Sequence, residues 1–420
     1  MNGFTVRLAA CAMAACAVAL FPACSEDNDG PKGNPREDIP LSRSEEELVE
    51  ANNEFAYKFM SAVCDAEKDS PNFVVSPLSL SMTMSMIANG AAGETQAQIL
   101  DMLGFDREDI EGLNSLNRKL LETLPGLDNQ SKVCLAQSVW VSKATSPDLN
   151  QNFVSLVTEN YSSPVTVLDR LDNREAMDRI NSWVSDKTEG MIGKFLSRPL
   201  DVDKMAIMNA LYFKGGWKGK FDKSKTQREK FANADGTLTE VDMMNAKHMA
   251  LDNFAEESYI AAAFPYGNCA FSMIIILPDR DTSVDECIKS LNHADLTKLA
   301  QGKLYTADLE VKLPKFAQNY NIDLVPVLKG LGVTDAFSEK ADFSGMLNHG
   351  SSQLSLLAQG STIVVDEGGT VASSVTIGGM GPTDPGPIET EEFFVDRPFA
   401  FIIAERSTGL PLFMGRLTKL

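Results

Sequence analysis

The amino-acid sequence predicts an α+β fold, and three observations carry this prediction. The 420 residues are 44% hydrophobic and 23% charged, which is an ordinary globular composition with enough chain for a sizeable core. Residues 205–213 form a nearly continuous apolar run, as expected of a central strand that is covered on both faces. The predicted helices and strands do not alternate in a βαβ rhythm, and there is no internal repeat.

Helical spacing of apolar residues predicts five helical segments. The first follows a capping box formed by Ser44 and Glu47, in which each side chain satisfies a backbone amide of the other residue. The next two are separated by a loop around Gly90 and Gly93. The predicted segments are 44–63, 79–86, 97–103, 174–187 and 322–331.

Alternating or continuous apolar runs predict the strands. The last two strands form a hairpin around Ser407, Thr408 and Gly409, which supply the turn. The predicted strands are 133–141, 165–168, 205–213, 271–277, 309–316, 354–365, 399–404 and 411–417.

The charge balance excludes several classes of partner. Lys and Arg number 38 against 58 Asp and Glu, giving a net charge of −20. Such a chain disfavours nucleic acid, heparin-like polyanions or an anionic membrane surface as its main partner. Only three His are present, so no metal site and no cofactor are expected.

The cysteines give no redox or metal signature. The four that follow the first 24 residues are widely spaced, without a CxxC pair, and are more often buried apolar side chains than ligands. Outside the cytoplasm a disulfide is permitted, but spacing alone does not assign one. These cysteines are Cys64, Cys134, Cys269 and Cys287.

The N-terminus is expected to be processed. Arg7 precedes an apolar run over 8–23 that has the length of a signal-peptide core and is short for a membrane span. A small residue before Cys24 resembles a bacterial lipobox, which implies a signal peptide over 1–23 and a lipidated Cys24. The acidic run after Cys24 resembles the surface-export signal of Bacteroidetes lipoproteins, and residues 24–43 are predicted to be a flexible tether. The implied location is the bacterial outer membrane, exposed at the surface. The alternative is ordinary signal-peptidase cleavage near Ala23 with an incidental Cys.

Residues 368–392 fit no regular element. Pro and Gly recur between 378 and 387, and a structureless loop of this length is uncommon unless it is functional or disordered. If the segment from Thr370 onward forms a strand, its side chains alternate between two faces. One face then carries only small side chains, namely Thr370, Ala372, Ser374 and Thr376. Such a strand can enter a filled sheet without a clash. The preceding residues Gly368 and Gly369 supply a hinge. The alternative is a flexible surface linker.

Short motifs over nearly the whole chain resemble those of the serpins, which are serine-protease inhibitors of the suicide type. They are 72–79 (NFVVSPLS), 90–95 (GAAGET), 180–184 (INSWV), 209–215 (NALYFKG), 264–266 (FPY), 273–278 (MIIILP), 313–316 (LPKF), 341–345 (ADFSG), 366–370 (DEGGT), 396–399 (DRPF) and 411–415 (PLFMG). The resemblance implies a single domain over 44–420 and a monomer. It also implies a large, mostly antiparallel central sheet with two smaller sheets, about eight or nine helices, and an exposed reactive-centre loop.

The resemblance implies a mechanism without a catalytic residue in this chain. A target serine protease, or also a cysteine protease, attacks the loop and forms an acyl-enzyme. The cleaved loop then inserts as a strand between 205–213 and 354–366, starting from a hinge at Glu367. The displaced protease loses its oxyanion-hole geometry and stays trapped.

In inhibitory serpins the reactive bond lies sixteen residues after the hinge Glu, which implies Thr383–Asp384. Met380–Gly381 is a second candidate because this loop is longer than in many relatives. No Lys or Arg occurs between 370 and 392, so the expected target is elastase-like or subtilisin-like rather than trypsin-like.

The resemblance also implies a polar cluster where the sheet opens. Ser76, Ser79 and Asn209 belong to it, and Gln359 stands where relatives often carry His. Gln retains hydrogen bonding but loses any pH-sensitive opening through a titrating His. Trp217, near the start of the insertion path, is either a latch or an ordinary core Trp.

The sequence disfavours two other functions. A non-inhibitory serpin-fold binding module, or a plain protease substrate, is disfavoured by the small loop face and the Gly-Gly-Thr hinge. A hydrolase is disfavoured because the sequence has no GxSxG, HExxH or P-loop motif and no suitably placed SxxK.

Overall fold

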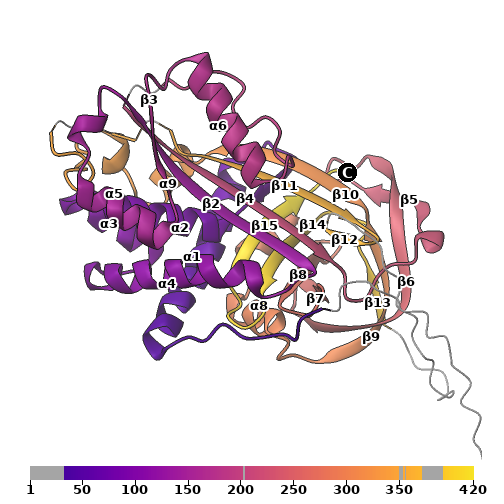
Figure 1. The fold of residues 1–420 in the computed structure, drawn as a ribbon. Coiled ribbons are helices and arrows are strands. Elements are labelled where there is room, and N and C mark those ends of the chain that lie inside the picture. Colours follow the sequence, from indigo (N-terminus) through magenta and orange to yellow (C-terminus); the bar gives the residue numbers. More distant parts are fainter. Residues whose placement is uncertain (1–32, 202–203, 350–352, 355, 371–390) are drawn as a thin grey trace, which may run out of the picture. The chain divides into compact units, whose positions relative to one another are not determined.

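The computed structural model describes residues 33–201, 204–349, 353–354, 356–370 and 391–420 (Figure 1). Within these ranges the architecture is α+β, as the sequence predicts, with helices packed on a six-stranded and a nine-stranded sheet. No helix in the described part of the chain is long and apolar enough to cross a membrane.

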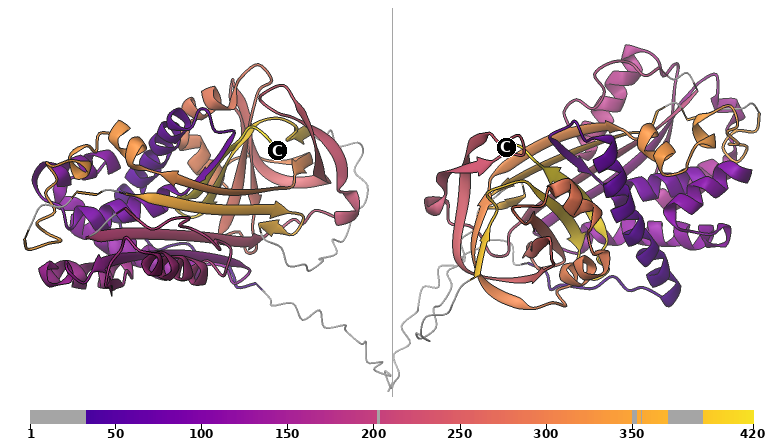
Figure 2. Two further views of the ribbon diagram at one scale, coloured as in Figure 1. Left: turned by 90° about the horizontal axis from the view of Figure 1, so that it is seen from above. Right: turned by 180° about the vertical axis from the view of Figure 1, so that it is seen from behind.

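A six-stranded sheet carries the candidate site. Its strand order is β10–β11–β12–β4–β2–β3, and most of its pairs are antiparallel. The two exceptions are the parallel pairs β2–β3 and β11–β4. The strands are β2 (Ser131–Ser142), β3 (Val165–Leu168), β4 (Met205–Gly216), β10 (Phe316–Asp323), β11 (Ala358–Asp366) and β12 (Gly369–Thr370). The apolar run at 205–213 is therefore a central strand, and β10 and β11 run side by side beyond it (Figure 2).

The remaining strands hydrogen-bond along one path, β1–β15–β14–β8–β7–β6–β9–β13, with β5 paired to β6. The two smaller sheets of the prediction are linked because the long strand β6 belongs to both and changes register at a bulge between Ala246 and Met249. The strands are β1 (Asn72–Val75), β5 (Gln227–Ala232), β6 (Leu238–Ala255), β7 (Tyr259–Pro265), β8 (Phe271–Pro278), β9 (Thr306–Pro314), β13 (Glu391–Phe394), β14 (Phe399–Glu405) and β15 (Pro411–Leu417). The predicted terminal hairpin is β14–β15.

Nine α-helices occur in the described residues. They are α1 (Arg43–Ala66), α2 (Pro77–Ala88), α3 (Gly93–Leu103), α4 (Ile110–Thr123), α5 (Gln151–Tyr161), α6 (Arg174–Lys187), α7 (Val284–Lys289), α8 (His293–Ala300) and α9 (Val325–Gly330). The sequence reading missed α4, α5, α7 and α8.

Three predicted helix starts are corrected. The helix predicted from 97 begins at Gly93, which was expected to lie in the preceding loop. The capping box of α1 is formed by Ser42 and Glu45, one S-x-x-E pattern earlier than Ser44 and Glu47. The helix predicted from 322 begins later, because Ile322 pairs with Gln359 in the sheet and so extends β10 instead.

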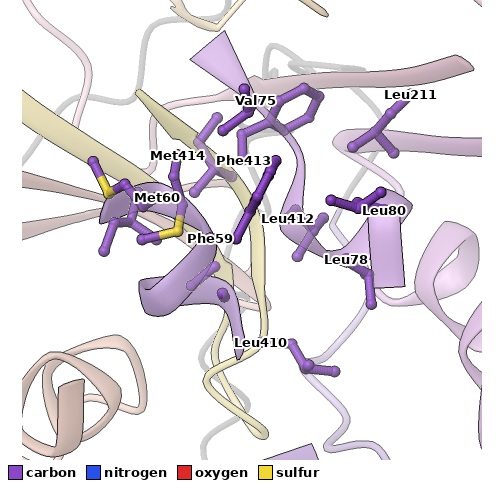
Figure 3. Packing of buried hydrophobic residues seen from close by; sticks show 14 of the residues in the cluster. Phe59, Met60, Val75, Leu78, Leu80, Leu211, Leu410, Leu412, Phe413 and Met414 are labelled. Carbon is purple, nitrogen blue, oxygen red and sulfur yellow. The ribbon is translucent and has the colours of Figure 1, made fainter. Parts of the chain in front are cut away.

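The core lies between α1, α2 and the two sheets (Figure 3). Phe59 of α1, Leu80 of α2, Leu211 of β4 and Phe413 of β15 pack into one cluster. Every residue of α2 is buried, including its Ser and Thr residues, so this helix runs under the six-stranded sheet as a fully enclosed element. A second, smaller cluster joins α6 to the sheet through residues such as Ile180 and Met208.

Candidate functional site

The six-stranded sheet is open at one end, between β4 and β11. The two strands pair directly only where Gln359 and Gly360 meet Asn209 and Ala210. Six residues further along each strand, at Val365 and Gly215, the two-residue strand β12 lies between them and pairs with both. One end of the sheet is therefore parted by the width of one strand.

Gly369 and Thr370, the predicted start of the inserting segment, form β12. Gly369 has a φ of 134°, and a Cβ there would lie 2.1 Å from the carbonyl oxygen of Gly215. Only glycine fits this close approach. The Thr370 side chain is buried, and its hydroxyl lies 2.6 Å from the hydroxyl of Tyr266. The hinge thus enters the sheet with its threonine side chain facing the core.

Trp217 fixes the turn that precedes β12. Its indole nitrogen donates to the carbonyl of Asp366 at 2.9 Å, and its backbone amide donates to the carbonyl of Gly368 at 2.9 Å. The ring stacks on Tyr266 with a centroid separation of 4.6 Å. Burial raises the pKa of the Tyr266 phenol, so its hydroxyl remains a neutral hydrogen-bonding partner of Thr370 even in alkaline solution. Trp217 is a buried residue and at the same time a direct partner of the hinge.

Glu367 is clasped from two sides. The hydroxyl of Thr226 donates to one carboxylate oxygen at 2.8 Å, and the ammonium of Lys315 lies 3.0 Å from the other. The Glu367 side chain is only 7% exposed. Burial alone would raise the pKa of this carboxyl, but the hydrogen bonds from its own backbone and Thr226, together with Lys315, outweigh burial and lower it. Glu367 is therefore held as a carboxylate.

The predicted polar cluster lies where β4 and β11 still meet. Gln359 accepts from the Ser76 amide at 2.7 Å and donates to the Ser76 carbonyl at 2.9 Å. Asn209 accepts from the Ser79 hydroxyl, donates to the Ser79 carbonyl at 2.8 Å, and donates to the Thr83 hydroxyl at 2.6 Å. All five side chains are buried. The bonds join both sheet strands to α2, so they hold the unopened part of the sheet closed.

The structure groups the predicted residues into two places. Ser76, Ser79, Asn209 and Gln359 form the closed part, whereas Trp217 lies with the hinge residues Glu367, Gly368, Gly369 and Thr370. Sequence reasoning missed Thr83, Thr226, Tyr266 and Lys315. Tyr266 and Lys315 lie inside two of the serpin-like motifs, and Thr83 lies one helical turn after Ser79. The sequence therefore pointed to these three positions, but it did not indicate what their side chains do.

Several predicted residues lie outside the described ranges. They are Cys24, Ala372, Ser374, Thr376, Met380, Gly381, Thr383 and Asp384. Among described residues the four cysteines are free thiols, with Cys64 and Cys287 buried. No group of His, Cys, Asp or Glu among these residues is arranged to hold a metal ion.

Comparisons with known proteins agree with this geometry. The chain is 30% identical to Iripin-3 of Ixodes ricinus over 384 residues, covering 90% of this chain and 96% of the relative. It is 31% identical to plasminogen activator inhibitor 1 of Neovison vison, covering 89% and 94% of the two chains. The native crystal structure of tengpin, a thermophilic serpin, matches with a TM-score of 0.80 at 30% identity, covering 93% of this chain and 97% of that chain.

The match to the tengpin structure over nearly the whole of both chains places this chain in the class of serpin folds. The family model described as "Serpin (serine protease inhibitor)" matches residues 50–420, and the chain belongs to the serpin family. Serpins are protease inhibitors that bind target serine proteases and are not enzymes.

Replacing Gln359 tests the closed part of the sheet. Gln359→Leu keeps the side-chain size but leaves the buried Ser76 amide without its partner, which costs about 1–3 kcal/mol. The Ser76 carbonyl loses one of two donors and still accepts from the Leu80 amide at 3.1 Å. We expect a lower unfolding temperature by scanning calorimetry. Gln227→Leu makes the same change at an exposed position of β5 and should have little effect. Equal unfolding temperatures for the Gln359 variant and the wild type would contradict this role.

Replacing Glu367 tests the clasp and its pH dependence. Because the folded pKa is lowered from 4.5, the carboxylate stabilises the folded protein fully above the ordinary Glu pKa, and this contribution is lost as the pH falls through the lowered value. Glu367→Gln should therefore unfold at a lower temperature than the wild type at pH 7, and the difference should close as the pH falls below 4.5. The exposed Glu257→Gln is the control. A gap that is constant between pH 7 and pH 3.5 would show that Glu367 acts without its charge.

Proposed function

We propose that this serpin is inhibitory and traps proteases by completing the insertion that β12 begins. One observation supports this proposal: the two-residue strand β12 already lies between β4 and β11 and pairs with both. The two residues that it bridges, Gly215 and Val365, each lie six residues beyond the directly paired Asn209 and Gln359. Because side chains alternate along a strand, residues 372, 374 and 376 would follow the Thr370 side chain toward the core. In this chain those residues are small, so an inserted strand would not clash.

Full insertion requires parting the closed segment. The inserting residues would have to separate the pairs that Gln359 and Gly360 make with β4, and to pass the bonds of Asn209 and Gln359 to α2. These bonds are few, and the new strand would gain backbone pairs on both of its edges. Under this proposal, breaking the pairs and hydrogen bonds of this closed part of the sheet, here called the polar seam, is the energy barrier that prevents the uninserted form from converting to the inserted form.

The proposed reactive bond is Thr383–Asp384, with Met380–Gly381 as the second candidate. Neither bond has a basic residue before it, and no Lys or Arg occurs between 370 and 392. The proposed targets are therefore elastase-like or subtilisin-like serine proteases. Cysteine proteases are proposed as additional targets, because they also form an acyl-enzyme with the loop.

A protease panel tests this proposal. A soluble form beginning at Ser25, mixed with elastase-, subtilisin-, chymotrypsin- and trypsin-like enzymes, should give an SDS-stable band at the summed mass with one of the first two. Ala372→Arg places a charge on the inward face and should turn the inhibitor into a cleaved substrate. Val371→Arg places the same charge on the outward face and should preserve the complex.

Three results would decide against inhibition or against its details. Loop cleavage without a stable complex for any enzyme would make the protein a substrate or binding module. Equal behaviour of the two Arg variants would exclude strand insertion. Cleavage at a bond other than Thr383–Asp384 or Met380–Gly381, found by mass spectrometry of the released C-terminal peptide, would exclude the proposed reactive bonds. If insertion occurs, the cleaved form should also unfold at a much higher temperature than the intact form.

We further propose that the protein is a lipoprotein of the bacterial outer membrane, anchored through Cys24 and exposed at the surface. Support comes from the sequence alone: the apolar run over 8–23, the small residue before Cys24, and the acidic run after it.

Cys24→Ser tests the anchor. In a bacterial host the wild type should partition into the detergent phase of a Triton X-114 extract and label with palmitate, and the variant should do neither. Cys16→Ser, in the predicted leader, should behave as the wild type. Membrane partition that survives Cys24→Ser would rule out this anchor, and external protease treatment of intact cells would decide which membrane face carries the protein.

A further inference from the structure

A cationic pocket lies beside the hinge in this strongly acidic protein. It has a volume of about 590 Å³ and is bounded by the segment after β4, the bulged bend of β6 and the end of β7. Five Lys or Arg side chains line it against two Asp, whereas acidic residues outnumber basic ones 58 to 38 in the whole chain. The five are Lys218, Lys220, Lys225, Lys247 and Arg406.

Part of this positive charge is not neutralised locally. Lys247 lies 3.4 Å from Glu310, and Arg406 lies 3.2 Å from Asp252. In contrast, neither Lys218 nor Lys225 makes an ion pair with any described residue. The ammonium of Lys218 lies 2.9 Å from the Cys269 sulfur, and Lys225 attracts the pocket carboxylate of Asp222 at longer range. The Nε of Arg406 is buried without a hydrogen-bond partner among the described residues. Mutual repulsion of these cations would be relieved by a bound anion.

The pocket floor is apolar. Trp217, Leu251 and Phe264 line it, and each of these side chains is buried. Cationic groups above an apolar floor suit a ligand with an anionic head and an apolar body, and the volume lies in the range of small-molecule sites. A long polyanion would extend beyond the pocket over a surface of the same sign and would be repelled.

The pocket shares a wall with the hinge. The segment 217–226 lines it through Trp217, Lys218 and Lys225, and the same segment holds the hinge backbone. Trp217 donates to the carbonyls of Asp366 and Gly368, and the amide of Phe221 donates to the carbonyl of Glu367 at 3.2 Å. A ligand that orders this segment would favour the docked hinge.

From these observations we infer that the pocket binds a small organic anion with an apolar body, such as an aromatic carboxylate or sulfonate, and that its occupancy stabilises the docked hinge. None of the residues that line the pocket belongs to the polar cluster of Ser76, Ser79, Asn209 and Gln359. Binding is measured on the intact protein without a protease, so this inference stands or falls independently of the proposed inhibition.

Calorimetric titration with 2-naphthalenesulfonate tests the pocket. We expect a dissociation constant on the order of 0.1–1 mM for a ligand of this size. Neutral 2-naphthalenesulfonamide and inorganic sulfate should each bind at least about fivefold more weakly, because one lacks the charge and the other the apolar body. Equal binding of the sulfonamide, or no heat with the sulfonate at concentrations well above this range, would overturn the inference.

Charge removal at the rim locates the site. The double variant Lys218→Gln/Lys225→Gln should weaken sulfonate binding by about tenfold. Lys230→Gln/Lys340→Gln removes two exposed lysines that do not line the pocket and should leave the affinity unchanged. Equal affinities for the two double variants would place the binding elsewhere and reject the pocket.

Amide hydrogen exchange tests the link to the hinge. At ten times the dissociation constant, a ligand that binds only the docked state slows exchange of the Trp217 and Phe221 amides by up to about tenfold. The amide of Leu116 in α4, a helix that packs on α1, α2 and α5 and lines no part of the pocket, should exchange at the same rate with and without ligand. Unchanged exchange at Trp217 under saturating ligand would overturn the coupling and leave only the pocket.

Discussion

The slot between β4 and β11 is the constraint on which the rest of the structure depends. The two strands touch at Asn209 and Gln359 and are one strand apart at Gly215 and Val365. Between these points no backbone pairing joins residues 211–214 to 361–364 in the described strands. Each unpaired strand edge costs free energy that an added strand would recover, so the sheet is built to gain a strand.

The polar seam explains how such a sheet can stay closed. An apolar contact between α2 and the sheet has no fixed direction. The buried groups of Asn209 and Gln359, in contrast, require hydrogen-bond partners in α2 and in its N-cap residue Ser76 in one geometry. Each bond contributes only about 0.5–1.5 kcal/mol net. A handful of them therefore sums to a few kcal/mol, which is enough to hold the strands together and small beside the pairing that a full inserted strand would form.

Sequence reasoning reached the parts of this arrangement that have local signals. The apolar run at 205–213 and the order of the motifs placed the central strand, and Gly368–Gly369 placed the hinge. Two overlapping S-x-x-E patterns start one helix, and local propensity did not separate Ser42 from Ser44. The clasp on Glu367 was out of reach, because Thr226 is 141 residues away in the chain and only the tertiary fold brings the two together.

Both ends of the segment between β12 and β13 are fixed to different sheets. Thr370 pairs with β4 and β11, whereas Glu391 to Phe394 pair in parallel with β9. Each further residue that an uncut loop inserts after Thr370 shortens the span left to reach Glu391. Insertion of the intact loop must finally detach β13 from β9 and lose those backbone bonds. Cutting the loop removes this opposing cost, so under the proposed mechanism the protease itself supplies the step that makes insertion favourable.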